Sequence, residues 1–176
     1  METKHLILSI PEPKKESAKE KAPPRKKVVA ESDDWPLISQ HLAPESQKRV
    51  LQEVKESRDP IHLHLERAIR TKLAGYKSQD MAKTLYDPTR FITYDQTVDS
   101  LSKSDLKCFY CRLPVHLFYE YVREPKQWSL ERIDNAHGHN TDNVEIACLE
   151  CNLRRKTMYH ERFVFTKQAV IVKHGT

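Results

Sequence analysis

The hydrophobic and polar positions divide the chain into an apolar-poor beginning, a helical middle and a strand-rich end. Residues 1–34 mix Lys, Glu, Pro and Ser with too few apolar side chains to offset the entropy lost when a backbone becomes ordered. We therefore expect a disordered arm there. Its stretch PPRKK could be a nuclear-import or phosphate-binding patch, but neighbouring acids nearly balance its charge, which favours a solvated linker.

Residues 35–106 carry apolar side chains at helical spacing. The pattern predicts a first helix that ends at Asp59 and Pro60, and a second helix with Gly75 as its C-cap. The second helix also carries basic side chains, which are expected on a solvated face or against a backbone phosphate: Arg67, Arg70 and Lys72.

Two shorter helices are expected before the first cysteine. One runs from Ser78 through Leu85, and the other covers ITYDQTVDSLSKSDLK with an N-cap near Thr93 or Thr97. Threonine is a suitable cap because its hydroxyl accepts a hydrogen bond from a free N–H group of the first turn.

After the first cysteine the pattern becomes that of short strands rich in aromatic and branched residues. We expect strands at residues 115–122, 128–133 and 144–147, and a helix over about 149–158. A closing strand or hairpin is indicated by a last apolar set: Phe163, Phe165, Val170 and Val172. The expected fold class is therefore α+β, with helices first and a small strand-and-helix module after them.

The composition limits the class of protein. The chain of 176 residues has 38% hydrophobic residues and a mean hydropathy of −0.73, which favours one compact unit with polar appendages over a large core. Thirty Lys and Arg against twenty-five Asp and Glu give a net charge of +5, a mild excess that suits a polyanionic partner without requiring one. Only three glycines occur, which excludes a Gly-rich phosphate loop.

The chain shows no segment for membrane insertion or export. No apolar run approaches the ~20 residues needed to cross a bilayer, and the N-terminus lacks the charged, apolar and small-residue order of a secretory signal. We expect a soluble, intracellular protein with no membrane partner, which could enter the nucleus in a eukaryotic host or a virus-infected cell.

Four cysteines in two Cys-x-x-Cys pairs carry the strongest chemical signal. Cys108 and Cys111 form the first pair and Cys148 and Cys151 the second, with 36 residues between the pairs. This arrangement predicts tetrahedral structural Zn²⁺, whose binding would add folding free energy to a weakly apolar module. A redox role is the alternative, but redox motifs of this kind act singly. Since four thiolates fill the tetrahedron, this zinc would not be the catalytic ion.

The string SLERIDNAHGHNTDNVEIACLECNLRRKTM begins between the two pairs and runs past the second. It resembles the core of HNH (ββα-metal) endonucleases, in particular the zinc-stapled variety of phages and large viruses and, more distantly, recombination endonuclease VII. The resemblance covers roughly residues 108–158. It implies a treble-clef-like ββα-metal module at 107–159, after a helical region at 35–106 and before a C-terminal strand or tail at 160–176.

The resemblance also implies a catalytic metal site. Glu131 takes the position of the acidic ligand, Asn143 the position that pins the loop, and Asn152 the helix position that completes the protein ligands. Carboxylate and amide oxygens suit Mg²⁺ or Mn²⁺ and leave room for water and phosphate. Such a cation would stabilise charge on the phosphate and on the departing 3′ oxygen.

One position departs from the family pattern, because Arg132 stands where a histidine general base is usual. Arginine can clamp a phosphate, but it stays protonated and is a poor base. His137 and His139 are therefore the candidates for the base, with a solvated or turn-pinning role as the alternative. Asp134 could be a second metal ligand or a turn residue.

Further side chains could contact nucleic acid. A basic set on the last helix could hold a flanking phosphate or serve solubility: Arg154, Arg155 and Lys156. An aromatic set could stack on bases, although aromatic residues at alternate strand positions more often form core: Tyr110, Tyr119 and Tyr121.

The resemblance implies the function of a metal-dependent endonuclease that hydrolyses DNA phosphodiester bonds and leaves a 5′ phosphate, with RNA not excluded as substrate. The alternative is a non-catalytic, zinc-stapled nucleic-acid-binding module on the same scaffold, in which Arg132 marks the lost base. A purely structural interaction domain is a third reading, and it leaves the grouping of Glu131, Asp134 and Asn152 unexplained.

Overall fold

The computed structural model describes residues 23–169 and combines helices with one two-stranded antiparallel sheet, which confirms the α+β class. In chain order the elements are η1 (Val28–Glu31), α1 (Trp35–Ser39), α2 (Pro44–Glu53), α3 (Pro60–Ala82), α4 (Tyr94–Lys103), β1 (Trp128–Arg132), β2 (Val144–Cys148), α5 (Leu149–Arg155) and α6 (His160–Gln168). Among these residues no helix is both long and apolar enough to cross a membrane.

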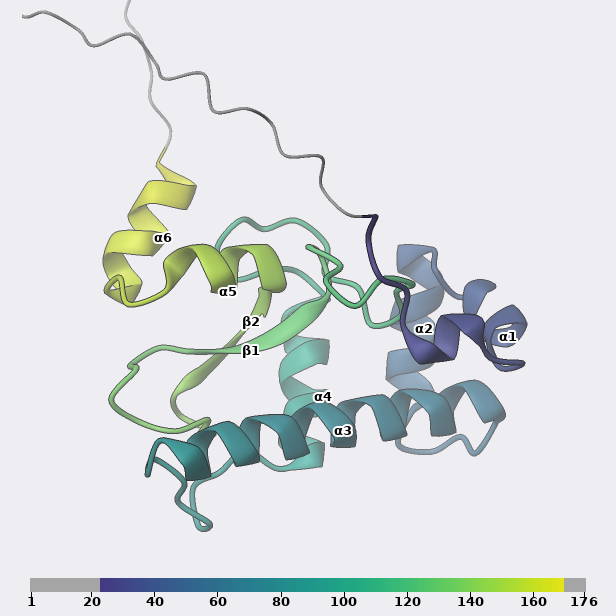
Figure 1. The fold of residues 1–176 in the computed structure, drawn as a ribbon, viewed down its shortest axis with the longest axis horizontal. Helices are drawn as coiled ribbons and strands as arrows, with labels where there is room; N and C mark the ends of the chain where they lie inside the picture. Colours follow the sequence, from purple (N-terminus) through teal and green to yellow (C-terminus); the bar gives the residue numbers. More distant parts are fainter. Residues whose placement is uncertain (1–22, 170–176) are drawn as a thin grey trace, which may run out of the picture.

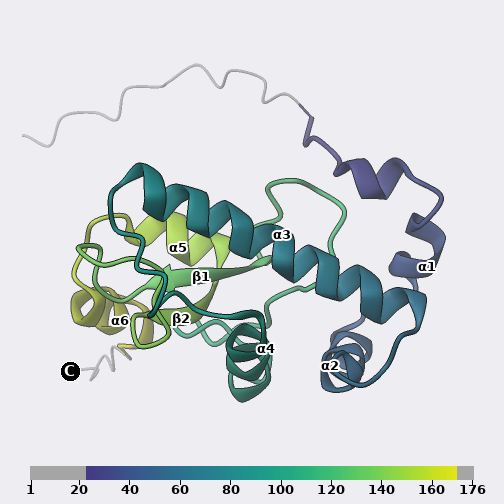
Figure 2. The same cartoon turned by 90° about the horizontal axis from the view of Figure 1, so that it is seen from below.

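The elements form two packed regions. The helices α2, α3 and α4 pack on one another, whereas α5 packs on both strands and α4 also contacts β2. Figure 1 shows α3 running along one side of the molecule, with the sheet and then α5 beyond it. Seen from below in Figure 2, α3 passes in front of α5 and lies beside β1, where the N–H of Leu130 donates to the hydroxyl of Tyr76.

The two strands lie where the sequence predicts them. They pair with Trp128 opposite Cys148 and Arg132 opposite Val144. The first four residues of β1 are buried, which fits a strand covered by α3 and α5. The register places the end of β2, and therefore the start of α5, beside the beginning of β1.

The strand expected at residues 115–122 is wrong. The segment makes only isolated bridges, including one between His116 and Gln127. Its backbone N–H groups are satisfied from elsewhere, because Oε1 of the buried Gln47 on α2 accepts from the N–H groups of Leu117 at 2.6 Å and Phe118 at 3.2 Å. The apolar residues thus enter the core without a neighbouring strand.

The helix α3 continues through Gly75, so a C-cap there and a separate helix at 78–85 are both wrong. Gly75 has no positive φ, and a Cβ added there would meet no atom within 4 Å. The buried face of the helix runs on from Ile69 and Leu73 to Asp80, and packing along that face outweighs the weak helix propensity of a single glycine. The helix ends at Ala82, and Thr84, the residue after the C-cap Lys83, takes a left-handed φ of 56°.

The N-cap of α4 is Thr93, as predicted. Its side chain accepts from the N–H of Gln96 at 3.3 Å, and Oε1 of Gln96 accepts from the N–H of Thr93 at 2.9 Å. This reciprocal capping box satisfies two N–H groups that the helix itself leaves free.

The C-terminal segment differs from the expected strand. Residues 160–168 form the helix α6, in which Phe163 is buried against Tyr110 and Phe165 is exposed. The preceding helix α5 ends at Arg155 rather than near 158, because Lys156 takes a φ of 51°. The other two residues of the expected strand, Val170 and Val172, lie outside the described residues.

The described part of the expected disordered arm is ordered, and only residues 1–22 of the arm lie outside the described residues. The N–H of Lys27 donates to Glu120 O at 2.8 Å, and the N–H of Val122 donates to Arg25 O at 3.0 Å. Lys26 also pairs with Glu120 at 2.6 Å. These backbone bonds attach the segment to the body of the protein, a long-range pairing that local composition does not encode.

Candidate metal centre and adjoining cleft

Four cysteines gather at the junction of β2 and α5. Cys108 and Cys111 lie in a tight turn, in which the N–H of Arg112 donates to Cys108 O at 2.9 Å and Arg112 has a φ of 61°. Cys148 is the N-cap of α5, and its Sγ accepts from the N–H of Cys151 at 3.4 Å. A turn and a helix start thus present two sulfurs each.

The geometry of the cluster fits a metal ion such as zinc. The four Sγ atoms lie within 4.8 Å of one another, and those of Cys111 and Cys148 are 3.9 Å apart. A tetrahedron with Zn–S bonds of ~2.3 Å has edges of about 3.8 Å. The cluster can therefore hold one ion.

The thiols also need a cation if all of them are to ionise. A hydrogen bond from Cys148 lowers the pKa of Cys108 to about 5, whereas the bond to Cys108, together with burial, raises the pKa of Cys148. The thiolate of Cys108 therefore keeps Cys148 protonated. A bound divalent cation would remove this conflict, since a coordinating thiol is deprotonated outright.

A cleft of about 240 Å³ lies between α3, β1, α5 and the loop after β1. Five of the predicted site residues line it: Glu131 and Arg132 from β1, His139 from the loop, Asn152 from α5 and Lys156 just after α5. Its basic lining residues are Arg132, Lys83 and Lys156. The cleft thus combines a carboxylate, an amide and an imidazole with positive charge around them.

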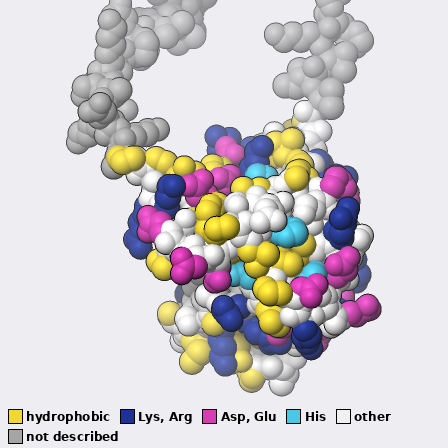
Figure 3. Space-filling view, turned by 90° about the vertical axis from the view of Figure 1, so that its right-hand side faces the viewer, with side chains coloured by type: hydrophobic (Ala, Val, Ile, Leu, Met, Phe, Trp, Pro, Cys, Tyr) yellow, Lys and Arg dark blue, Asp and Glu magenta, His cyan; other side chains and the backbone are white. Residues whose placement is uncertain are grey.

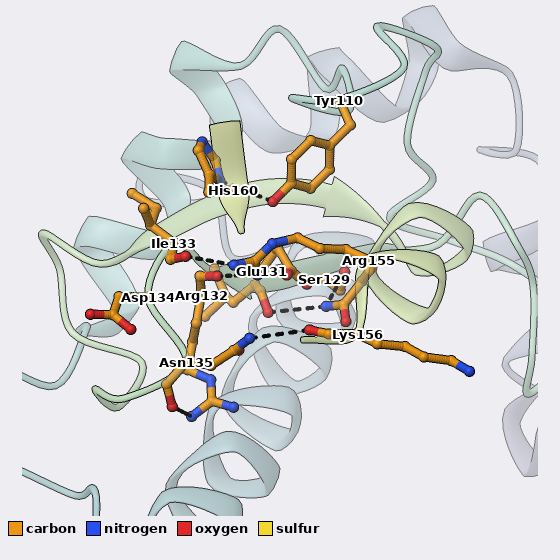
Figure 4. A network of polar contacts seen from close by, with 12 residues as sticks. Tyr110, Ser129, Glu131, Arg132, Ile133, Asp134, Asn135, Arg155, Lys156 and His160 are labelled. Carbon is orange, nitrogen blue, oxygen red and sulfur yellow. Dashed lines mark hydrogen bonds and ion pairs between the residues drawn. The ribbon is translucent and has the colours of Figure 1, made fainter. Parts of the chain in front are cut away.

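Glu131 is buried and paired with Arg155, which is itself only 2% exposed. The same guanidinium donates to the carbonyl oxygens of Arg132 at 2.5 Å and Ile133 at 2.6 Å. Figure 4 shows Arg155 reaching between these groups at the end of β1. Arg155 is therefore not a surface contact for a phosphate, as sequence reasoning had allowed, but a buried clamp on the strand end.

Burial and pairing act in opposite directions on Glu131. Burial raises the pKa of its carboxyl, and the hydrogen bond and charge of Arg155 oppose that rise. Because Arg155 approaches Oε1, the other oxygen of the carboxylate is left for a different partner. In the next helix, Nδ2 of Asn152 donates to Ser129 Oγ at 3.2 Å and to Leu130 O at 3.4 Å, which holds the amide against β1.

His139 is buried and held by Asp80 of α3. One oxygen of the Asp80 carboxylate accepts from the N–H of His139 at 2.6 Å, and the other lies 2.8 Å from Nδ1. The ring packs on Tyr76, with 4.4 Å between ring centres. Burial lowers the pKa of His139, and the bond to Asp80 opposes this. An imidazole that donates from Nδ1 to a carboxylate keeps its lone pair on Nε2.

Asp80 is the residue of the candidate site that sequence reasoning missed. A signal for it exists, because Asp80 lies seven residues after Leu73 on the apolar face of α3, where a buried acid needs a partner. The assumption that the helix ends at Gly75 hid this spacing.

The loop can approach Asp80 closely only because residue 138 is glycine. A Cβ at Gly138 would stand 2.5 Å from Leu85 O and 2.9 Å from an Asp80 carboxylate oxygen. Asn143 closes the base of the same loop, donating from Nδ2 to Asp134 O at 2.9 Å and to Gly138 O at 3.0 Å. These are the contacts of a residue that pins a loop.

Two other predicted residues stay outside the cleft. The Asp134 side chain is 58% exposed, and Figure 4 shows its carboxylate pointing away from Glu131. His137 is also exposed and lies 3.7 Å from Asp134, while its carbonyl oxygen accepts from Arg132 at 3.1 Å. The structure therefore brings His139, and neither His137 nor Asp134, to Glu131 and Asn152.

The remaining predicted contacts divide between surface and core. Arg154 is exposed and pairs with Glu150 at 3.0 Å on the outside of α5. Tyr110 is fully buried in the core, Tyr119 keeps 8% exposure and Tyr121 is partly exposed. The face formed around α1 and α2 mixes both signs of charge with histidine and apolar side chains, as Figure 3 shows, so that end presents no continuous basic surface.

Comparison of the chain with family models, with curated proteins and with solved structures found no match. We therefore infer function from the cysteine cluster and the cleft.

Proposed function

We propose that the chain is a metal-dependent endonuclease of the HNH type that hydrolyses phosphodiester bonds of DNA. The observation that carries the proposal is the meeting of Glu131, His139 and Asn152 in one cleft with a basic lining. These groups come from a strand, a loop and a helix, and a cleft that brings them together suits a reaction needing a cation, a base and a phosphate.

The cysteine cluster serves as the structural staple in this proposal. Zn²⁺ at the four cysteines would join the turn at Cys108 to the first turn of α5, where Cys151 immediately precedes Asn152. Because four thiolates complete the coordination of zinc, the cluster would offer no place for substrate. Its contribution would be to fix the position of Asn152 relative to β1.

Glu131 and Asn152 would hold Mg²⁺ or Mn²⁺ with one carboxylate oxygen and one amide oxygen. Such a cation would supply Lewis-acid stabilisation of charge on the phosphate and on the leaving 3′ oxygen. The hydrogen bond and charge of Arg155 favour the ionised form of Glu131 against its burial, and because Arg155 occupies Oε1, the second oxygen would bind the cation. Arg132, Lys83 and Lys156 would attract the phosphate backbone.

His139 would act as the general base. Asp80 accepts from Nδ1, so Nε2 carries the lone pair that takes a proton from the attacking water. The lowered pKa of His139 keeps the imidazole neutral, and therefore basic, at neutral pH. This arrangement supplies the base that Arg132 cannot supply at its own position.

A non-catalytic nucleic-acid-binding module is the second candidate, and one observation favours it. Glu131 is already paired with Arg155, so the carboxylate could be purely structural and the basic residues of the cleft could grip a phosphate without a second metal. In that case the protein would bind nucleic acid and leave it intact in every cation.

Plasmid cleavage separates the two candidates. The zinc-loaded full chain is incubated with supercoiled plasmid and single-stranded DNA in Mg²⁺, in Mn²⁺ and without added cation. We expect cation-dependent nicking that Glu131→Gln and Asn152→Ala reduce by about 10²-fold or more. Glu150→Gln is the matched control, since Glu150 is an exposed carboxylate on α5 outside the cleft. DNA binding without nicking by the wild-type chain or any variant would support the binding module instead.

A further inference from the structure

A second hollow lies apart from the cleft, between residues 25–29, the first half of α3 and residues 117–128. It encloses about 480 Å³, within the ~300–1,000 Å³ of pockets that hold small ligands. Its apolar lining consists of Val28, Val29, Leu117, Tyr119, Val122 and Trp128, together with Ala68.

The charged groups around the hollow are all basic. They are Arg25, Lys27, Arg67 and Lys72; His64 also lines the hollow, but burial lowers its pKa, and none of the described lining residues is acidic. Of the acids nearby, Glu120 is paired with Lys26 at 2.6 Å, and the charge of Asp34 acts on His64. The hollow therefore has an excess of positive charge.

Both lysines that line the hollow lie over aromatic rings rather than beside carboxylates. Nζ of Lys72 is 4.8 Å from the centre of the Trp128 ring and donates to Trp128 O at 2.5 Å and Gln127 Oε1 at 3.0 Å. Nζ of Lys27 is 4.1 Å from the centre of the Tyr119 ring. Lys72 is therefore not the solvated helix residue that the sequence pattern predicts.

The environment of these lysines disfavours their charge. Burial lowers the pKa of Lys72 to about 7, and the charge of Lys27 contributes to this. Burial also lowers the pKa of Lys27. An anion in the hollow would stabilise both cations, to which the described residues offer ring faces and, for Lys72, two neutral oxygens.

The hollow and the cleft share one face of α3. The residues along that face line first the hollow and then the cleft: His64, Ala68, Lys72, Tyr76, Gln79 and Lys83. On β1, Trp128 lines the hollow and Leu130 the cleft. The seven residues from Lys72 to Gln79 rise about 10 Å, which corresponds to about three phosphates at ~3.4 Å each along one DNA strand.

We propose that the hollow binds one nucleotide unit of the nucleic acid, with its phosphate at the basic groups and its base on the apolar lining. Arg25 and Arg67 are exposed at the hollow, and a guanidinium binds phosphate through two parallel hydrogen bonds. The choice of a nucleotide rests on the proposed function of the neighbouring cleft, whereas the preference for an anion rests on the hollow alone.

Calorimetric titration of the full chain tests the proposal, with thymidine 5′-monophosphate as the probe and thymidine and laurate as comparisons. We expect the nucleotide to bind and Arg67→Ala to weaken its affinity about tenfold. Lys72→Met, which keeps the aliphatic stem and removes the charge, should weaken it similarly. Arg70→Ala is the matched control, because Arg70 is an exposed arginine on α3 that pairs with Glu66 and does not line the hollow.

Two results would overturn the hollow as a nucleotide site. One is unchanged nucleotide affinity in both Arg67→Ala and Lys72→Met, and the other is tighter binding of laurate than of the nucleotide. The Glu131→Gln variant separates this outcome from failure of the nuclease proposal. If no variant or wild-type protein cuts DNA but Arg67→Ala still weakens nucleotide binding, the hollow stands and the nuclease fails. If Glu131→Gln abolishes cutting while Arg67→Ala and Lys72→Met bind the nucleotide normally, the reverse holds.

Discussion

The two walls of the cleft are held in place by different forces. Glu131 and Asn152 stand on a sheet of two five-residue strands and a short helix, which meet at the cysteine cluster. Asp80 stands on α3, a helix of 23 residues whose apolar face packs through Leu65 and Ile69 into the core. One wall therefore rests on a cysteine cluster that can hold a metal ion and on a buried ion pair, and the other on apolar burial.

His139 depends on both walls. Its loop begins at the end of β1, which Arg155 clamps, and its ring is oriented by Asp80 on the opposite side. The two walls can therefore be tested separately, because a change on one wall should move His139 without unfolding the other wall.

Removing the metal should give the largest effect, and it should act on one wall. Structural zinc sites contribute about 10–16 kcal/mol of apparent binding free energy in small zinc modules. In Cys148→Ser we therefore expect the amides of β1, β2 and α5 to lose protection from hydrogen exchange, while those of α2, α3 and α4 keep it. Hydrogen exchange with mass spectrometry measures both regions in one experiment.

Native mass spectrometry supplies the control for this comparison. We expect one zinc per wild-type chain and none in Cys148→Ser. Equal loss of protection in α3 and in β1 would mean that the two walls form one cooperative unit, which would contradict their separate stabilisation.

Replacing Arg155 by methionine should have the next largest effect. It leaves the buried Glu131 without its partner, a change that destabilises by about 3–5 kcal/mol in comparable buried pairs. Urea unfolding followed by circular dichroism measures this loss.

The pH dependence of this variant has a definite sign. Burial alone raises the pKa of Glu131 above its unfolded value, so the native state binds more protons than the unfolded state. The stability of Arg155→Met should therefore fall as pH rises from the unfolded pKa of glutamate through the raised folded value. The double variant Glu131→Gln, Arg155→Met removes the titrating group, and a pH slope that persists in it would contradict this account.

Short-range features of this fold could be predicted from the sequence. Thr93 and Gln96 form a capping box within four residues, and the strand from Trp128 was predicted from a short local run that includes aromatic and branched residues. The spacing of the cysteines likewise predicted a cluster that can hold a metal ion. In each case the residues that decide the structure lie close together in the chain or, like paired cysteines, are of a type that has few roles in proteins.

Features decided by distant residues could not be predicted. Gln47 satisfies the backbone near Leu117 across 70 residues, which removes the need for a strand there. Arg155 reads locally as one of three basic residues on a helix, and only the folded β1 gives it the buried Glu131. Asp80 acquires its role from a histidine 59 residues later. A sequence pattern predicts which face of a helix or strand is buried, but it does not predict which other element that face packs against.

Asp80→Asn should reduce the rate without changing the overall fold, provided that the cleft is catalytic. Loss of an orienting group of this kind typically costs about 10–100-fold. The carboxylate raises the pKa of His139, so its removal should lower that pKa and shift the acidic limb of the rate profile to lower pH. The measurement is kcat/KM against pH for DNA nicking.

Asp142→Asn is the matched control for Asp80→Asn. Asp142 lies in the same loop region, but it is exposed and pairs with Arg90 at 2.6 Å rather than with His139. An Asp80→Asn profile identical to that of Asp142→Asn would show that Asp80 does not act through the histidine.

Gly75→Ala should have the smallest effect and the opposite sign. Gly75 lies inside α3 with no positive φ, and a Cβ there would meet nothing within 4 Å. Alanine should therefore raise the free energy of unfolding by about 0.5–1 kcal/mol, because it restricts the unfolded chain and costs the helix nothing. Gly138→Ala is the contrasting case, since its Cβ would collide with Leu85 O at 2.5 Å on the loop that carries His139. Thermal unfolding of both variants distinguishes a glycine that the helix tolerates from one that the cleft requires, and destabilisation by Gly75→Ala would mean that α3 breaks where the sequence pattern first placed its end.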